Sequence, residues 1–252
     1  MKKIVITNRK GGVGKTTTVF NLAWYFARKG LKVLVIDTDG QQDLKKSFGI
    51  TNVKVSLGDY LLGKVNDFDP IIINDKLHFI SAGSDENVSD DMIALQNKSP
   101  MCFKLLDKLL NAIADDYDIA MIDTAPALNL YTKSAIYSSD CIYIPMTAGT
   151  FEIDAIRTTI NFVKTNGKQI NGIILTRREK TGLSQEIEKG LIDNYSKYML
   201  DTKIRKNIAL SEALAVKESI FEFAPKSNGA VDYQALGDEI SSREGIKWAK
   251  EK

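Results

Sequence analysis

Residues 9–17 read Arg9-Lys10-Gly11-Gly12-Val13-Gly14-Lys15-Thr16-Thr17. The run follows a short apolar segment, Ile4 to Ile6, and precedes a helical pattern from Thr17 to Lys29 that stops at Gly30. A glycine-rich run ending in Gly-Lys-Thr between a strand and a helix is the context that supports a Walker-type phosphate loop. The sequence therefore predicts a βαβ unit with a phosphate-binding loop after its first strand.

Each residue type in this loop has a physical use. Glycines let backbone N–H groups turn inward around phosphates, and the following helix adds the positive end of its dipole. We expect Lys15 to contact the β- and γ-phosphates, Thr16 to give a hydroxyl to Mg²⁺, and Thr17 to reach the α-phosphate. ATP and Mg²⁺ are the expected ligands, and the predicted nucleotide-binding loop residues are Lys10, Gly11, Gly12, Val13, Gly14, Lys15, Thr16 and Thr17.

The bulk composition is that of a globular protein. At 252 residues the chain is near the upper size that one hydrophobic core organises, so we expect a single domain over residues 1–252. The hydrophobic fraction of 44% and the charged fraction of 26% exclude a disordered composition. A net charge of +2 does not by itself indicate a polyanion partner.

Other residue types exclude several classes of site. Cys102 and Cys141 have no metal-ligand spacing and are interpreted as two buried thiols in a reducing compartment. His78 is the only histidine, which excludes a His-based triad, and is interpreted as a structural residue near a strand. The amino terminus lacks a signal-peptide pattern, and no apolar run approaches the ~20 residues that a membrane span needs. We expect a cytoplasmic protein without stable membrane association.

Short apolar runs bounded by turn residues alternate with helical patterns along the chain. The predicted strands are Ile4 to Ile6, Val33 to Ile36, Leu77 to Ser81, Ile119 to Ile122, Cys141 to Pro145 and Gly172 to Thr176. Further helices are predicted at Ser56–Leu62, Lys104–Ala114, Ile153–Asn166, Ser184–Lys197, Leu210–Val216 and Tyr233–Ser241. This alternation favours an α/β fold with a doubly wound, mostly parallel sheet flanked by helices on both faces.

Two segments are less regular. Phe48 to Asn97 is rich in Asp, Asn and Gly, and we interpret it as surface connections around one strand. The last residues, Ser241 to Lys252, place four basic residues around two apolar ones: Arg243, Lys247, Lys250 and Lys252 around Ile246 and Trp248. A frayed, solvated terminal helix is the favoured interpretation, and a basic amphipathic membrane tail is the alternative.

A lysine at the second position of the run, Lys10, resembles the deviant Walker A motif of the ParA/MinD family of partition and positioning ATPases. In that family the early lysine crosses a nucleotide-sandwiched dimer to touch the partner's phosphates. The resemblance therefore implies an ATP-dependent homodimer in which Lys10 acts in trans. A positive charge delivered there would stabilise the charge that develops on the transferred phosphoryl group.

Two strand ends support the same resemblance. Asp37-Thr-Asp39-Gly40-Gln41 is similar to the family's Asp-x-Asp-Pro-Gln motif, with Gly40 where proline is usual, which puts the rigidity of the turn in doubt. Asp39 is expected to orient the attacking water and to assist at the metal, with Asp37 in support. Tyr117 to Pro126 has the pattern of a Walker B strand, in which Asp123 would hold Mg²⁺ through water and residues 124–126 would form a switch loop.

The resemblance continues to the carboxyl-terminal part. Gly172 to Thr176 followed by Thr181-Gly-Leu-Ser184 looks like the family's late strand and next helix. Ser211-Glu-Ala213 and Phe223 to Tyr233 look like its carboxyl-terminal signature, whose proline loop closes over the adenine. By this resemblance Pro225 is an adenine contact, and Thr176 and Arg177 occupy a similar place. The predicted catalytic set is Lys10, Lys15 and Asp39, and the predicted metal set is Thr16, Asp39 and Asp123.

Within the family, the short ParA/Soj partition type is the best match, because only nine residues precede Lys10. This similarity implies sequence-nonspecific DNA binding by the dimer, association with the nucleoid, and stimulation of hydrolysis by a ParB-type centromere-binding partner. Such binding needs clustered basic side chains that neutralise phosphates. The candidates are Lys203, Arg205, Lys206 and Lys217, with Arg157 and Lys164 behind them.

Three other functions remain open. A MinD-like membrane-associated positioning ATPase would use the carboxyl-terminal tail as an amphipathic helix. An iron–sulfur carrier would need paired cysteines, which Cys102 and Cys141 do not offer. A small-molecule ligase or kinase would show metabolite-dependent ATP turnover.

Overall fold

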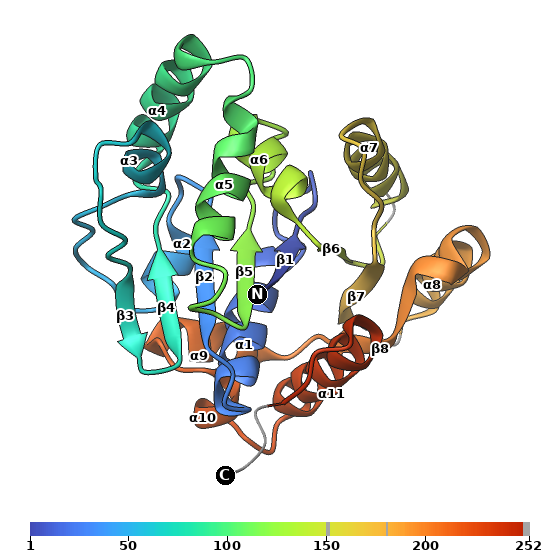
Figure 1. Cartoon of the computed structure of the whole chain (residues 1–252). Helices are drawn as coiled ribbons and strands as arrows, with labels where there is room; N and C mark the ends of the chain where they lie inside the picture. Colours follow the sequence, from blue (N-terminus) through green and yellow to red (C-terminus); the bar gives the residue numbers. More distant parts are fainter. Residues whose placement is uncertain (150–151, 180, 249–252) are drawn as a thin grey trace.

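The computed structural model describes residues 1–149, 152–179 and 181–248. One eight-stranded sheet forms its centre, and helices cover both of its faces (Figure 1). The strands are β1 (Lys2–Ile6), β2 (Val33–Asp37), β3 (Ile71–Asn74), β4 (Leu77–Ile80), β5 (Ile119–Asp123), β6 (Cys141–Met146), β7 (Gly172–Arg178) and β8 (Met199–Arg205). The α-helices are α1 (Lys15–Arg28), α2 (Asp43–Ser47), α3 (Leu57–Leu62), α4 (Asp85–Lys98), α5 (Leu105–Ala112), α6 (Leu130–Ser138), α7 (Glu152–Thr165), α8 (Gly182–Tyr195), α9 (Ile208–Val216), α10 (Ile220–Phe223) and α11 (Asn228–Glu244), and the 3₁₀ helices are η1 (Cys102–Lys104) and η2 (Ser196–Tyr198).

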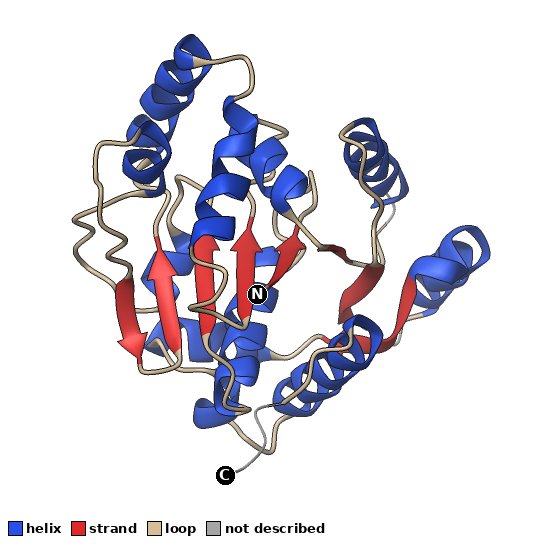
Figure 2. Cartoon of the chain, in the orientation of Figure 1, coloured by secondary structure: helices blue, strands red, loops and turns tan. Residues whose placement is uncertain are grey.

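The strand order is β3-β4-β2-β5-β1-β6-β7-β8, and every pairing is parallel except that of the edge strand β3 with β4 (Figure 2). The order reverses at β1, whose neighbours are β5 and β6. Ligands of open α/β sheets bind outside the carboxyl ends of the strands at such a reversal. The predicted fold class is confirmed, and the loop after β1 begins at that position.

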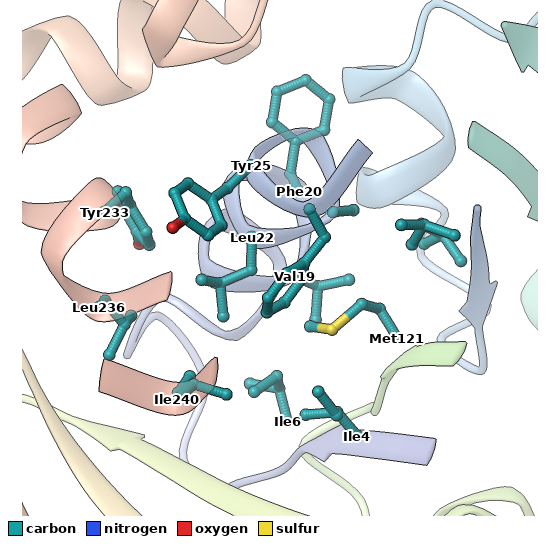
Figure 3. Packing of buried hydrophobic residues seen from close by; sticks show 14 of the residues in the cluster. Ile4, Ile6, Val19, Phe20, Leu22, Tyr25, Met121, Tyr233, Leu236 and Ile240 are labelled. Atoms are coloured by element: carbon teal, nitrogen blue, oxygen red, sulfur yellow. The ribbon is translucent and has the colours of Figure 1, made fainter. Parts of the chain in front are cut away.

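Two hydrophobic layers hold the helices to the sheet, and alternate residues of each strand contribute to opposite layers. Ile4 and Ile6 of β1 pack in the layer formed with α1, α2, α9, α10 and α11, whereas Val5 packs in the layer formed with α3 to α8. Figure 3 shows part of the first layer, in which α1 and α11 lie side by side against the sheet. Because both faces are covered, the central strands are apolar along their length, as the sequence patterns predicted.

The predicted strands are confirmed within two residues at each end, but the structure adds edge strands β3 and β8. Our interpretation of Phe48 to Asn97 as connections around one strand is wrong, because this segment contains α3, α4, β3 and β4. Helix α4 buries only Val88, Asp91 and Leu95, so its apolar periodicity is weak. Its start is instead marked by a capping box between Ser84 and Asn87.

The other structural residues behave as expected. Cys102 and Cys141 are buried and not joined by a disulfide. His78 is the second residue of β4 and its Nδ1 lies 2.7 Å from the hydroxyl oxygen of Tyr117.

The described part of the carboxyl-terminal tail is not a frayed helix. Helix α11 ends at Glu244, and Gly245 follows in the left-handed conformation that stops a helix. Ile246 packs against the core, and the Trp248 ring lies 5.9 Å from that of Tyr25. Lys250 and Lys252 lie outside the described residues. Across the described ranges, no helix has both the length and the apolar character needed to cross a membrane.

Candidate nucleotide site

Strand register brings three predicted site segments together. Asp37, the last residue of β2, is paired with Asp123, the last residue of β5, and Asp123 is paired with Ile6 at the end of β1. The phosphate loop, the Asp37–Gln41 turn and the switch loop therefore start side by side at the carboxyl edge of the sheet. This arrangement follows from parallel pairing, which aligns the ends of neighbouring strands.

The phosphate loop has a defined conformation. Gly12 and Gly14 have φ values of 73° and 89°, in the region that favours glycine, and α1 begins directly afterwards at Lys15. The Thr176 hydroxyl of β7 donates to the Val13 carbonyl over 2.8 Å. Arg177 Nη1 donates to the Gly12 carbonyl over 3.3 Å. Thr176 and Arg177, which sequence similarity placed near the adenine, thus hold the loop itself.

The Lys15 side chain is buried, with the residue 7% exposed, and its ammonium donates back into the loop to the Lys10 carbonyl over 3.1 Å. Burial lowers the pKa of Lys15, and the nearby charges of Asp123 and Asp39 oppose that shift. One bond to a backbone oxygen does not fully compensate a buried ammonium, since this group carries three donors. It is suited to receive an anion such as a phosphate.

The carboxylates beside the loop are buried and incompletely hydrogen-bonded. The Thr16 hydroxyl donates to Asp123 Oδ2 over 2.7 Å, whereas Asp123 Oδ1 and Asp37 Oδ2 are buried without a partner among the described residues. Burial raises the pKa of Asp123 to about 7, against the opposing influence of Thr16 and Lys15. Burial and then the charge of Asp123 raise the pKa of Asp37 well above its ordinary value.

These orphaned oxygens fit a cation and its water shell. Buried polar atoms are nearly always paired in native proteins, so two carboxylate oxygens of this kind next to a hydroxyl indicate a ligand site. Mg²⁺ prefers oxygen ligands and takes few of them from protein in phosphate sites. Thr16 and Asp123 have the chemistry to hold it, with Asp37 as the second charge.

The Asp39 turn is held by hydrogen bonds from its own backbone N–H groups to its own carboxylates. The Asp39 N–H donates to Asp37 Oδ1 over 2.9 Å, and the Gln41 N–H donates to Asp39 Oδ1 over 3.1 Å. Gly40 does not loosen the turn as its replacement of proline suggested. A Cβ there would lie 2.7 Å from the Cα and 2.9 Å from the N of Asp85, so atoms of Asp85 occupy the space that a side chain at residue 40 would need.

A cavity of about 530 Å³ connects these groups. Its residues from the first half of the chain are Gly11, Gly12, Gly14, Lys15, Thr16, Thr17, Asp39, Gln41, Asp43 and Pro126. Its residues from the second half are Thr176, Arg177, Ile204, Arg205, Lys206, Asn207, Ile208, Leu210, Ser211 and Tyr233. The size suits a nucleotide, since ligand pockets are typically ~300–1,000 Å³.

Pro225 is not among the residues that line this cavity, and its contact with adenine stays a prediction. The loop after β8 and the first turn of α9 form one side of the cavity. Because β8 was not predicted from the sequence, the position of the loop between β8 and α9 could not be predicted either. Asn207 was the available signal, since it caps α9 by accepting from the Ala209 N–H over 2.9 Å.

Lys10 is half-buried and lines a neighbouring cavity of about 340 Å³ together with Thr147, Ala148, Arg177 and Glu179. Its backbone N–H donates to Asn8 Oδ1 over 3.0 Å. The backbone at Lys10 is thus fixed by an adjacent buried side chain. The structure places Lys10 at the phosphate loop but gives it no part in the larger cavity's lining.

The predicted DNA-contacting residues are largely committed to carboxylates. Lys203 pairs with Glu188. Arg205 makes a 2.6 Å ion pair with Asp232 and lines the nucleotide cavity. Lys206, with 57% of its side chain exposed, pairs with Glu179 over 2.8 Å.

The remaining basic candidates are spread over other elements. Lys217 is exposed at the end of α9. On α7, Arg157 lies 3.7 Å from Asp154, and Lys164 is exposed in the last turn. The predicted DNA contacts are thus divided among β8 and the loop after it, the residue that ends α9, and α7.

Comparisons with known proteins bear on the family and the fold of the chain. A family model described as an AAA domain matches residues 1–176. Over 96% of its length the chain is 31% identical to the sporulation initiation inhibitor protein Soj of Bacillus subtilis, 98% of which is covered. It is 28% identical to the chromosome partitioning protein ParA of Caulobacter vibrioides, with 99% of this chain and 97% of that protein covered. The solved structure of a Cyanothece McdA variant in complex with ATP has the same fold, with a TM-score of 0.86 at 22% identity over 100% of this chain and 99% of that one.

Proposed function

Because this chain belongs to the ParA/MinD family of P-loop ATPases, we propose that it is a partition ATPase that hydrolyses ATP slowly, as a nucleotide-sandwiched dimer on DNA. The observation that carries the proposal is the cluster of Lys15, Thr16, Asp37, Asp39 and Asp123 at one sheet edge, beside a cavity of nucleotide size. The names of the relatives, a chromosome partitioning protein among them, support the cellular role.

We assign the chemical work as follows. Loop N–H groups and the Lys15 ammonium bind the phosphates. A phosphate oxygen then replaces the Lys10 carbonyl as the acceptor for the Lys15 ammonium. Bound Mg²⁺ would neutralise charge that develops on the phosphates. Thr16 and Asp123 would hold it, and Asp39, fixed by Gln41, orients the attacking water.

Lys10 completes the site in the proposed dimer. Its backbone is fixed at the loop, while its side chain lines the smaller cavity next to Gly11 and Gly12. A lysine supplied by the partner subunit would raise the positive charge around the phosphates only after two chains meet. Hydrolysis by the monomer is then slow because the site is incomplete.

The DNA-binding surface requires basic side chains that are available to phosphates. Lys203 and Arg205 pair with the buried carboxylates Glu188 and Asp232, whereas the partner of Lys206, Glu179, is itself exposed. We therefore retain Lys206 and Lys217 as the candidates for direct contact. A ParB-type partner is proposed to stimulate hydrolysis and so to release the DNA. Nucleoid association follows from this proposal.

The test is retention of DNA by purified protein with ATP, with ADP and without nucleotide, across a salt series. We expect ATP-dependent retention that falls steeply with salt, as counterion release requires. Lys10→Ala should bind ATP but fail to dimerise, and Asp39→Ala should accumulate as an ATP-bound dimer because hydrolysis is blocked. DNA retention that is indifferent to nucleotide would refute the partition role.

The MinD-like alternative depends on the tail, whose described part packs through Trp248 on Tyr25. That contact occupies one of the two apolar side chains an amphipathic tail would need. If the protein co-sedimented with anionic liposomes in the presence of ATP, the MinD-like function would be preferred to the partition function.

A further inference from the structure

The amino-terminal end of α4 packs directly on the turn that carries Asp39. Gly40 has no side chain, and the space next to its Cα is taken by the backbone of Asp85, the first residue of α4. A Cβ at residue 40 would lie within 3 Å of both the N and the Cα of Asp85. Contacts that close leave no room for the turn and the helix to move independently.

Gln41 links the two segments through both of its amide groups. Its backbone N–H donates to Asp39 Oδ1 over 3.1 Å, and its side-chain Nε2 donates to Asp85 Oδ2. The Asp85 carboxylate therefore reaches the Asp39 carboxylate through one intervening residue. Because Gln41 is tied to Asp85 through its side chain, the bond from its backbone N–H restricts the rotation of the Asp39 side chain.

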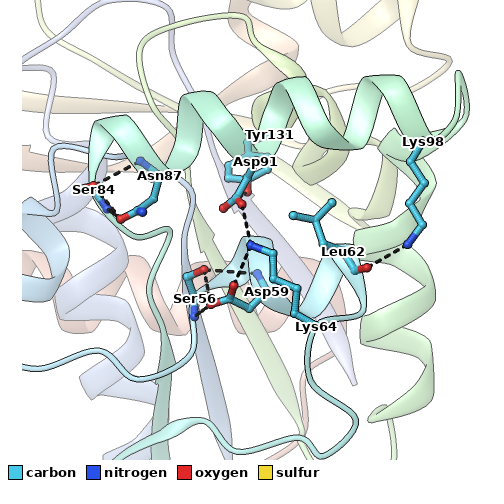
Figure 4. A network of polar contacts seen from close by, with 9 residues as sticks. All are labelled: Ser56, Asp59, Leu62, Lys64, Ser84, Asn87, Asp91, Lys98 and Tyr131. Carbon is cyan, nitrogen blue, oxygen red and sulfur yellow. Dashed lines mark hydrogen bonds and ion pairs between the residues drawn. The ribbon is translucent and has the colours of Figure 1, made fainter.

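Helix α4 is itself a fixed support (Figure 4). Its Asp91 is buried and accepts hydrogen bonds from Lys64 over 3.4 Å and from the Tyr131 hydroxyl over 3.5 Å. Its last residue, Lys98, donates to the Leu62 carbonyl over 2.8 Å. Because these contacts reach α3, α6 and the loop after α3, α4 cannot shift toward or away from the turn without breaking them.

We propose that Asp85 is a positioning residue for hydrolysis, which holds the Asp39 carboxylate in place through Gln41. The inference rests on the proposed function, in which Asp39 orients the attacking water. Gly40 makes the arrangement possible, since any side chain at that position would displace the first turn of α4. The role of Asp85 is confined to the chemical step, because it does not line the nucleotide cavity.

The experiment separates binding from chemistry. The affinity for Mg²⁺-ATP is measured by calorimetry, and the rate of phosphate release is measured in a single turnover on the full chain. We expect Asp85→Ala to lower the single-turnover rate about tenfold with ATP affinity within about twofold of the parent. Asp85→Asn should restore most of the rate, because the amide oxygen still accepts from Gln41.

The matched control is Asp90→Ala, which removes an exposed carboxylate on the same helix. It should leave both quantities unchanged, which excludes a general effect of α4 charge. In a double-mutant cycle, Gln41→Ala combined with Asp85→Ala should be no slower than Gln41→Ala alone, because both changes break one path. Additive losses, or an Asp85→Ala rate equal to that of Asp90→Ala, would overturn the positioning role.

Gly40→Ala gives an independent measurement if Asp85→Ala does not fold. We expect a similar loss of rate, because two of the three atoms nearest to a Cβ at residue 40, the N and the Cα of Asp85, belong to the backbone and cannot rotate away. A parent-like rate for Gly40→Ala would overturn the proposal. A parent chain that fails to bind or hydrolyse ATP contradicts the proposed function, whereas a working parent with a parent-like Asp85→Ala contradicts only the positioning role.

Discussion

Two carboxylates at opposite ends of the same sheet have opposite environments. Asp123, at the carboxyl edge, has one oxygen bonded to Thr16 and one buried without a partner in the described part of the chain, and burial raises its pKa to about 7. Glu244, at the amino edge, accepts from Cys141 over 2.8 Å, Tyr143 over 2.6 Å and Asn171 over 2.9 Å.

Lys2 adds an ion pair to Glu244 at 3.5 Å. Burial alone would raise the pKa of Glu244, but these hydrogen bonds and the lysine charge hold it below its ordinary value. The amino edge is therefore complete by itself, while the carboxyl edge is complete only with a ligand. An unsatisfied buried charge is tolerated where function needs it and is destabilising elsewhere.

The largest expected effect tests the incomplete edge. Lys15→Ala should weaken Mg²⁺-ATP binding by at least about a hundredfold, ~2.7 kcal/mol, because it removes a buried charge that pairs with phosphates. Its thermal stability without nucleotide should change much less, because removing a buried ammonium offsets the lost bond to the Lys10 carbonyl and the lost attraction to Asp123 and Asp39. Calorimetry and thermal melts measure both quantities.

Lys76→Ala, which changes an exposed lysine outside the cavity lining, is the control for this substitution. A Lys15→Ala protein that binds ATP normally would contradict the assignment of the phosphate loop.

The complete edge should show the reverse pattern. Glu244→Ala leaves two buried donors, Cys141 and Tyr143, and the half-buried Asn171 without their acceptor. It should lower the free energy of unfolding by about 2 kcal/mol, with ATP affinity unchanged. Urea unfolding at pH 7 measures the loss. Glu186→Ala, which changes an exposed glutamate on α8, should have no such effect. Equal stability of the two variants would remove the contrast between the edges.

Removing the charge at the incomplete edge should stabilise the protein. In metal-free and nucleotide-free buffer at pH 8, Asp123→Asn should raise the free energy of unfolding by about 1 kcal/mol. With Mg²⁺-ATP added, the same variant should not hydrolyse ATP. A raised pKa means that ionisation costs stability as pH rises from the ordinary value near 3.8 to about 7. The advantage of Asp123→Asn should therefore grow over that window and vanish below about pH 3.

The measurement is a set of urea midpoints at several pH values, and Mg²⁺-ATP should reverse the order of stability. Destabilisation by Asp123→Asn at pH 8 without metal would show that the carboxylate is fully compensated in the empty site.

The smallest effect is the acid dependence of Glu244. Because its pKa is lowered, its contribution is fully present above the ordinary value near 4.5 and is lost as pH falls through the folded pKa. The difference in the free energy of unfolding between the parent and Glu244→Gln should thus decrease between pH 6 and pH 3. The expected decrease is between a few tenths of a kcal/mol and about 1 kcal/mol. A pH-independent difference would mean that Glu244 acts through packing alone.

The two edges also differ in how far sequence analysis predicted them. The phosphate loop and Asp123 lie in local patterns, where strand, turn and helix signals follow one another within about a dozen residues. The partners of Glu244 are 73 to 103 residues away in sequence, so no local pattern could join them.

The nucleotide site shows the same limit within itself. Strand β8 was missed because its edge position leaves only Leu200 and Ile204 buried, and the cavity wall formed by the loop after β8 was missed with it. Pro225 was assigned by the resemblance of Phe223 to Tyr233 to a family signature, and its contact with adenine stays a prediction. The support of Asp39 by Asp85 depends on α4, whose weak apolar stripe hid it.

Helix α11 joins the two ends of the sheet. Its Tyr233 hydroxyl lies 3.2 Å from that of Thr18 on the first turns of α1 and lines the nucleotide cavity, and its Glu244 closes the amino edge. Protein synthesis delivers α11 after every other helix and strand of the described fold. A nascent chain on the ribosome thus exposes its glycine loop long before the opposite wall exists, and it acquires the finished cavity only after Tyr233 has emerged from the exit tunnel.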